Sequence, residues 1–109
     1  MELVRISALA PTTPDGHWGV DARLVEEAGG RLRVHSCLMA PLGGAERHVH
    51  QEHDQMFVVL EGALEVRGAD DDTLVARAGE AVRIPAGAPH ATANGSDGPT
   101  RYLVLTYPA

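Results

Sequence analysis

Residues 43–62 read GGAERHVHQEHDQMFVVLEG, and this stretch decides the fold of the chain. It joins a group of metal-ligating side chains to a short apolar run that ends at a glycine. The ligand-type side chains are His48, His50, His53 and Gln55. The apolar run, 56–60, is hydrophobic on both alternating faces of an extended chain, which predicts a central strand buried on both sides.

His48 and His50 are separated by one residue, in a segment predicted to be a short strand. Side chains alternate along a strand, so both imidazoles point the same way, with Cβ atoms about 7 Å apart. That spacing suits two ligands of one ion, each about 2.1 Å from it. Gln55 shares a face with Phe57 and Val59, and if Gln55 points inward these two line the floor of a pocket.

A second stretch, residues 79–94, reads GEAVRIPAGAPHATAN and carries His90 behind a proline-rich turn. Its glycines and prolines suit a chain reversal, because glycine tolerates positive φ and Pro85 ends a strand without wasting a hydrogen-bond donor. By itself His90 is equally a turn residue. If the fold brings it beside the first stretch, it becomes a further ligand of the same site.

Together the two stretches resemble the two motifs of the cupins, a family of small β-barrel proteins. The first family motif has the form G-x5-H-x-H-x(3,4)-E-x6-G, and here the chain departs from it twice. Leu42 stands in the slot of the first glycine, and Gln55 stands where the family usually has glutamate. Asp54 is the rival for that position, but Gln55 keeps the six-residue spacing to Gly62. The second motif, G-x5-P-x-G-x2-H-x3-N, is matched at every fixed position by Gly79, Pro85, Gly87, His90 and Asn94.

The resemblance implies an all-β fold, the cupin double-stranded β-helix or jelly-roll barrel. It also implies one bound divalent ion (Zn, Ni, Mn or Fe) and a homodimer. The implied metal ligands are His48, His50, Gln55 and His90. His53 is either a loop residue or an extra ligand.

The rest of the chain agrees with an all-β fold. No stretch shows a sustained helical apolar period, and short apolar runs recur between Gly, Pro and Asp clusters, which indicates about ten short strands. Residues 3–9 are predicted to form a first strand, and the Gly16–Gly19 stretch a loop. Residues 32–39 are predicted to form a strand that ends at the break 41–44. One domain, 1–109, accounts for the 109 residues.

Composition narrows the function classes. The formal net charge of −6 argues against a nucleic-acid partner, which would need a basic face. The longest apolar run, 56–60, is too short to cross a membrane. A single cysteine, Cys37, and an N-terminus unlike a signal peptide lead us to expect a cytoplasmic protein.

Gln55 is informative for the chemistry. A shell of three histidines and one amide is neutral, so a bound M²⁺ keeps its full charge and is a stronger Lewis acid toward a carbonyl. The change also removes the carboxylate that quercetinase-like cupin dioxygenases use. The prediction is therefore non-oxidative cyclase, isomerase or lyase chemistry on a small molecule, similar to cupin polyketide cyclases or uronate-acting cupins. The alternatives are a metal-dependent dioxygenase and a non-enzymatic small-molecule-binding cupin.

Such chemistry needs a base or acid, and the sequence offers several candidates without choosing among them. His53 and Glu52 lie in the loop between the ligands, a position as compatible with facing solvent as with facing the pocket. Tyr102 lies on the last strand. The predicted substrate-pocket residues are Phe57, Val59, Met39 and His35. Finally, Met56, Val58 and Leu60 place an apolar face opposite the pocket, where we expect a second copy to bind.

Overall fold

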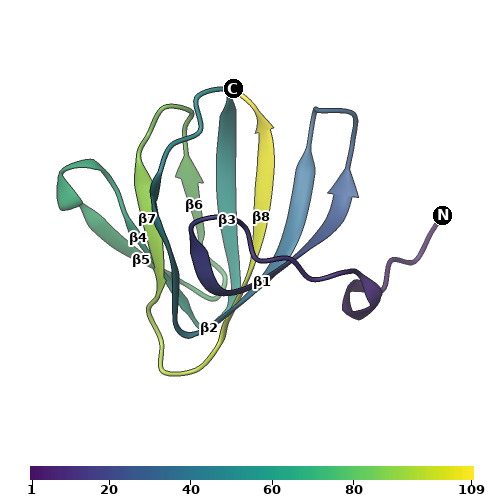
Figure 1. Ribbon diagram of the computed structural model, residues 1–109, viewed down its shortest axis with the longest axis horizontal. Helices are drawn as coiled ribbons and strands as arrows, with labels where there is room; N and C mark the ends of the chain where they lie inside the picture. Colours follow the sequence, from purple (N-terminus) through teal and green to yellow (C-terminus); the bar gives the residue numbers. More distant parts are fainter.

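The computed structural model describes all residues, 1–109, and consists of eight antiparallel strands curled into a nearly closed barrel (Figure 1). Two 3-10 turns, η1 (Ile6–Ala8) and η2 (Ala69–Asp71), are its only helical elements. No helix in the structure has the length and apolar character needed to span a membrane. The strands are β1 (His17–Glu27), β2 (Arg33–His48), β3 (His53–Glu61), β4 (Ala63–Arg67), β5 (Thr73–Arg77), β6 (Ala81–Ile84), β7 (His90–Asn94) and β8 (Thr100–Pro108). The all-β prediction is confirmed.

The long strand β2 ties the barrel together. The sheet order is β5-β4-β7-β2-β8-β3-β6, with β1 paired to β2 as well. β2 pairs with β8 from Arg33 to Met39 and with β7 from Gly44 to His48. One strand therefore runs from the β1–β2 hairpin to the ligand cluster, and its residues line distant parts of the cavity wall.

The prediction that 41–44 ends a strand is wrong, because β2 continues through it. The reason is the change of partner: β8 pairs only as far as Met39 and β7 only from Gly44. Pro41 therefore lacks an N–H where no ladder bond is required, which is where a sheet tolerates proline. Leu42 adopts a positive φ of 65° at this bend.

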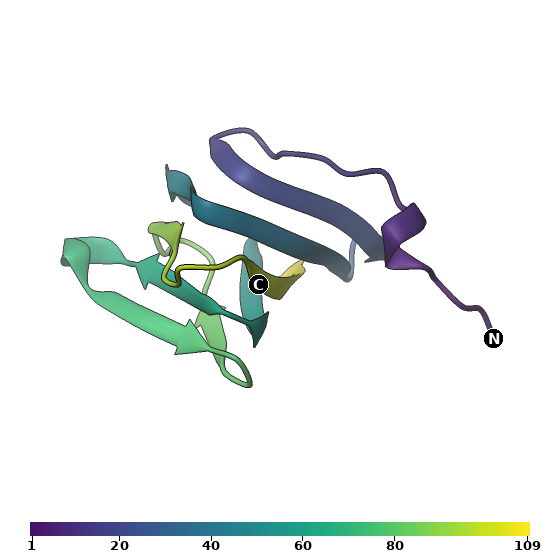
Figure 2. The same cartoon turned by 90° about the horizontal axis from the view of Figure 1, so that it is seen from below.

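The first predicted strand, 3–9, is also absent. The segment contains η1 and extends away from the barrel (Figures 1 and 2), with Leu3 84% exposed. Its attachment comes from Arg23, whose Nη1 donates to the carbonyl oxygens of Ser7 and Leu9. The first strand instead begins at His17, inside the stretch predicted to be a loop.

The inward faces of the strands form one core. β3 lies between β8 and β6, as expected for a central strand. Its inward residues Phe57 and Val59 are buried, whereas Met56 and Val58 on the outer face are only partly buried and Leu60 is 49% exposed. In the single chain the apolar run is therefore buried on one face only, which corrects the two-sided prediction. The core residues are Val20, Ala22, Cys37, Met39, Phe57, Val59, Leu64, Val66, Ala76, Val82, Ile84 and Tyr102.

Candidate metal centre

Strand pairing brings the two ligand-bearing stretches together. His48 is the last residue of β2 and His90 the first of β7, and the two are direct partners in the antiparallel ladder. His50 follows two residues after β2 ends, outside any strand. The predicted short strand 48–50 is therefore absent, yet the side chains of His48 and His50 still converge.

The three histidines form a compact cluster. One ring nitrogen from each of His48, His50 and His90 lies within 4.8 Å of the other two. Ring centroids are 4.3 Å apart for His48 and His90, and 5.0 Å apart for His48 and His50. Imidazole ligands lie about 2 Å from an ion that they share, so only small side-chain rotations are needed for all three to bind one ion.

Backbone hydrogen bonds fix which nitrogen is available on two of these rings. Nδ1 of His48 donates to the carbonyl oxygen of Glu46 at 2.8 Å, and Nδ1 of His90 donates to that of Ala88 at 3.0 Å. Each Nδ1 thus carries the proton, and the Nε2 lone pair is left free to coordinate. This orientation of imidazoles by backbone carbonyls is usual for metal-binding histidines.

Two buried polar atoms in this region have no hydrogen-bond partner, Nε2 of His90 and Oε1 of Gln55. Gln55 lines the same cavity as His48 and His50, and its Nε2 donates to Oγ1 of Thr106 at 3.2 Å. A buried polar atom without a partner costs free energy, so native proteins rarely leave one. Both atoms are lone-pair donors, and a cation among His48, His50, His90 and Gln55 would satisfy them. The donor set fits a divalent metal.

Burial favours the neutral form of His50 and His90. Desolvation lowers the pKa of His50, and the nearby His48, His53 and His17 lower it further. Desolvation also lowers the pKa of His90, against a smaller opposing effect of the hydrogen bond to Ala88. Neutral imidazole is the form that binds metal, so the site is prepared for an ion near neutral pH.

The turn before β7 is held against the first stretch by two hydrogen bonds. The backbone N–H of Gly87, at φ 82°, donates to the carbonyl oxygen of His50 at 2.8 Å. The N–H of Ala86 donates to Oδ1 of Asp54 at 2.8 Å. Asp54, the rival candidate for the fourth ligand, therefore holds the turn that positions His90.

Asn94 also has a structural role. Its Nδ2 donates to the carbonyl oxygens of Met39, Ala40 and Gly98, at 3.2, 3.1 and 2.9 Å. These bonds tie the end of β7 to the bend in β2 and to the loop before β8. The asparagine of the second motif therefore secures the far end of the strand that begins with His90.

A cavity of about 590 Å³ is lined by His48, His50 and Gln55, whereas His90 does not line it. Four of the predicted catalytic and substrate-pocket residues line it, namely Phe57, His35, His53 and Tyr102. Arg101, the neighbour of Tyr102 on β8, is exposed on the other face. Burial raises the pKa of the Tyr102 hydroxyl well above its ordinary value, and the neighbouring Cys37 raises it further, so this phenol stays protonated.

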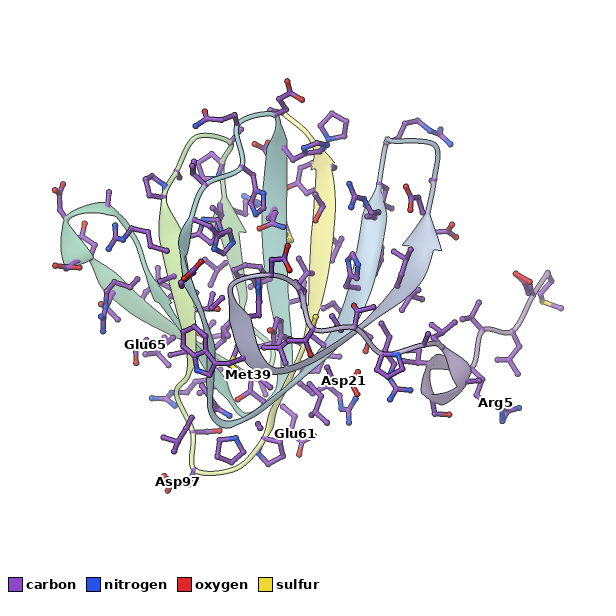
Figure 3. The ribbon with its side chains drawn as sticks, viewed as in Figure 1. Arg5, Asp21, Met39, Glu61, Glu65 and Asp97 are labelled. Atoms are coloured by element: carbon purple, nitrogen blue, oxygen red, sulfur yellow. The ribbon has the colours of Figure 1, made fainter.

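Three predicted residues lie elsewhere. Met39 and Val59 have no exposed surface and belong to the core rather than the cavity wall. Met39 pairs with Thr100 at the lower end of the view in Figure 3. Glu52 is exposed in the loop before β3 and does not line the cavity.

One further cavity residue, His17, was not predicted from the sequence. Its ring centroid lies 5.7 Å from that of His48, and its Nδ1 donates to the carbonyl oxygen of Asp15 at 2.9 Å. Only the pairing of His17 with Ala45 across β1 and β2 places it there. No spacing in the sequence relates it to the other histidines.

Comparisons with known proteins agree with the geometry. A family model described as "Cupin domain" matches residues 35–106. The polyketide cyclase RemF from Streptomyces resistomycificus is 25% identical, with a TM-score of 0.85 over 99% of this chain and 79% of that one. The TT1209 protein of Thermus thermophilus is 30% identical, with a TM-score of 0.78 over 99% of this chain and 98% of that one. A predicted oxalate decarboxylase from Thermotoga maritima shares the fold at 16% identity, with a TM-score of 0.87 over 99% and 100% of the two chains. A comparison with curated protein sequences found no match.

Proposed function

Because this chain belongs to the cupin family, we propose that it is a metal-dependent enzyme that transforms a carbonyl-bearing small molecule without oxidising it. The reaction class is cyclisation, isomerisation or elimination. The observation that carries the proposal is the pair of buried, unpartnered atoms, Oε1 of Gln55 and Nε2 of His90, beside two further histidines on a cavity wall.

His48, His50, His90 and Gln55 would hold the ion, and all four ligands are neutral. When bound, a divalent ion supplies Lewis-acid polarisation of a carbonyl oxygen. A neutral shell leaves the charge of the ion uncompensated, which strengthens that polarisation. The absence of a carboxylate ligand also favours non-oxidative chemistry over the dioxygenase alternative.

Other cavity residues would bind the substrate and move protons. Phe57 gives the cavity an apolar wall that excludes water from one side of the substrate. Tyr102 presents a phenol that stays protonated, which suits a hydrogen-bond donor to a developing oxyanion. His53, which also lines the cavity, carries an imidazole able to accept a proton. Of the two loop residues considered as the base, His53 is the one that remains, because Glu52 lies outside the cavity.

The similarity to RemF supports cyclisation within this class. RemF is described as a polyketide cyclase, and the resemblance covers 99% of this chain and 79% of RemF. We therefore place poly-carbonyl compounds first among candidate substrates and unsaturated uronates second.

The test is a metal analysis followed by a reaction assay. Protein purified without a histidine tag should contain about one divalent ion per chain. Incubated with a poly-β-ketone or an unsaturated uronate, it should give a product of equal mass, or of mass reduced by water, without oxygen consumption. Oxygen uptake with a product heavier by two oxygen atoms would assign it to the dioxygenases. Binding without turnover would make it a small-molecule-binding cupin.

We further propose that the protein acts as a homodimer in the cytoplasm. The apolar outer face of β3, formed by Met56, Val58 and Leu60, is continuous with Leu103 and Leu105 of β8, since Val58 pairs with Leu103 and Met56 with Leu105. Covering this face with a second copy would bury apolar surface that the single chain leaves partly exposed.

A further inference from the structure

We propose that Arg33, the first residue of β2, binds an anionic group of the substrate, so that the compound bound at this site is a carbonyl-bearing acid. This inference rests on the proposed function for the carbonyl end of the substrate. Arg33 lines the same cavity as His48, His50 and Gln55, although it is 15 positions away from His48 in sequence.

The ladder fixes where Arg33 stands relative to the metal ligands. Arg33 pairs with Thr106 across β2 and β8, and Thr106 pairs with Gln55 across β8 and β3. The three residues form one row across adjacent strands. Since strands lie about 4.8 Å apart, the backbone of Arg33 is about 10 Å from that of Gln55. A small organic acid with its carbonyl near Gln55 can extend its other end along this row.

The charge of Arg33 is available to a ligand. Arg33 is the only arginine that lines the cavity, and the chain contains no lysine. The three salt bridges of the structure use Arg23, Arg47 and Arg67 instead. Glu27 pairs with Arg33 across the β1–β2 ladder, but their charged groups form no ion pair within 4.0 Å.

Two polar neighbours would complete the anion subsite. Thr106 lines the cavity next to Arg33 and carries a hydroxyl. His35 lies two residues along β2 on the same wall, and burial lowers its pKa, with a smaller contribution from the charge of Arg33. A neutral imidazole and a hydroxyl each add one hydrogen bond, while a guanidinium binds a carboxylate in bidentate fashion.

A carboxylate is the anion that these groups fit. One guanidinium supplies a single positive charge, which balances one carboxylate. Asp15 is the only acidic residue of the cavity lining. It lies on the segment before β1, where its carbonyl oxygen accepts a hydrogen bond from His17. The wall between Arg33 and Gln55 carries no acidic residue, and Glu27, whose charge acts on His35, lies outside the cavity lining.

The experiment uses two matched probes, 4,6-dioxoheptanoate and its methyl ester, which differ by one charge and one methyl group. Each carries a β-diketone for the metal, and the carboxylate is two carbons away. Dissociation constants are measured with Co²⁺-loaded protein from the visible absorption of the ion. We expect the acid to bind about threefold to tenfold more tightly than the ester. The preference is this modest because Arg33 is exposed, so that solvent screens its charge. In Arg33→Met this preference should vanish while the affinity for the ester is unchanged, and Arg33→Lys should retain part of it.

Arg31→Met is the matched control, because Arg31 lies in the adjacent turn and does not line the cavity. It should keep the full preference for the acid. Equal binding of acid and ester to the native protein, or a preference that survives in Arg33→Met, would overturn the inference. If Co²⁺ does not bind, the proposed function fails separately. The inference is then judged on metal-free protein, where 4,6-dioxoheptanoate, but not its ester, should shift the NMR signal of the Arg33 Nε–H.

Discussion

Gln55 and Thr106 face each other across β3 and β8, and Nε2 of Gln55 donates to Oγ1 of Thr106 at 3.2 Å. This bond uses the amide nitrogen and leaves Oε1 of Gln55 buried without a partner. In this orientation the amide oxygen is the end that is free to coordinate. Gln55 would offer a ligand oxygen without a negative charge, in place of the glutamate of the family motif.

Gln55→Glu should bind Zn²⁺ or Ni²⁺ more tightly, by roughly tenfold to a hundredfold, because a carboxylate adds a charge-assisted interaction. The same substitution should slow the Lewis-acid reaction, because the added charge reduces polarisation of the carbonyl. Competition against a metal chelator measures the affinity. Gln51→Glu adds the same charge to an exposed loop next to His50 and should change neither quantity much. Unaltered affinity in Gln55→Glu would show that this side chain does not coordinate.

Metal binding should stabilise the native protein and fail without the histidine cluster. At an ion concentration a hundred times Kd, the stabilisation is about 2.7 kcal/mol. For a domain of this size that corresponds to a rise in Tm of roughly 10–20 °C. His50→Ala should lose the rise, as measured by calorimetry with and without Zn²⁺. His53→Ala should retain it, since His53 lies outside the three-histidine cluster, and loss of the rise in that variant would make His53 a further ligand.

The metal-free protein should lose stability in acid. Burial lowers the pKa of His50 and His90 in the folded state, relative to the ordinary value of 6.5. Between those lowered pKa values and pH 6.5, the unfolded chain therefore binds more protons than the folded protein does. The stabilisation is complete above pH 6.5 and is lost as the pH falls through the lowered folded pKa values.

Urea unfolding between pH 8 and 5 tests this, and the slope should be smaller in His50→Gln. Saturating Zn²⁺ should steepen the acid loss, because protons then also displace the ion. Equal stability of the metal-free protein at pH 7.5 and pH 5 would contradict the burial of these imidazoles.

Tyr102→Phe should lower kcat by about a hundredfold or more, because it removes a hydrogen-bond donor to the developing oxyanion. Because burial raises its pKa, this group should not give an alkaline limb to the rate profile below pH 9. Tyr107→Phe is the control, since Tyr107 lies on the same strand but outside the cavity. A kcat within twofold of the native value in Tyr102→Phe would leave that residue a packing role against Phe57.

Val58→Glu should convert a dimer to monomers, because it places a charge in the centre of the apolar outer face of β3. Sizing chromatography should show the native protein near twice the chain mass of 11.5 kDa and the variant near that mass. Circular dichroism and Zn²⁺ binding by the variant check that the barrel is intact. Leu74→Glu, at an exposed position of β5, is the matched control and should remain dimeric. A native protein of 11.5 kDa would refute the dimer.

Much of the site could be predicted from the chain itself. The spacing from Gln55 to Gly62 separated Gln55 from Asp54, and the structure gives Asp54 a different partner, the N–H of Ala86. The chain reversal predicted from the glycines and prolines of 79–94 lies between β6 and β7, before His90. Errors occurred where local signals competed with pairing. Pro41 looked like a strand end but lies at an exchange of partners, and residues 3–9 had strand-like composition but no strand to pair with.

The sequence by itself determined the ligand types and the all-β class, because metal chemistry depends on side-chain identity and strand formation on local alternation. Only the tertiary structure decided which residues share the cavity. The ladder between β2 and β7 sets His90 opposite His48, and the row from Gln55 through Thr106 to Arg33 crosses three strands. The β1–β2 pairing adds His17. Such contacts depend on register between segments far apart in the chain, which no local spacing encodes.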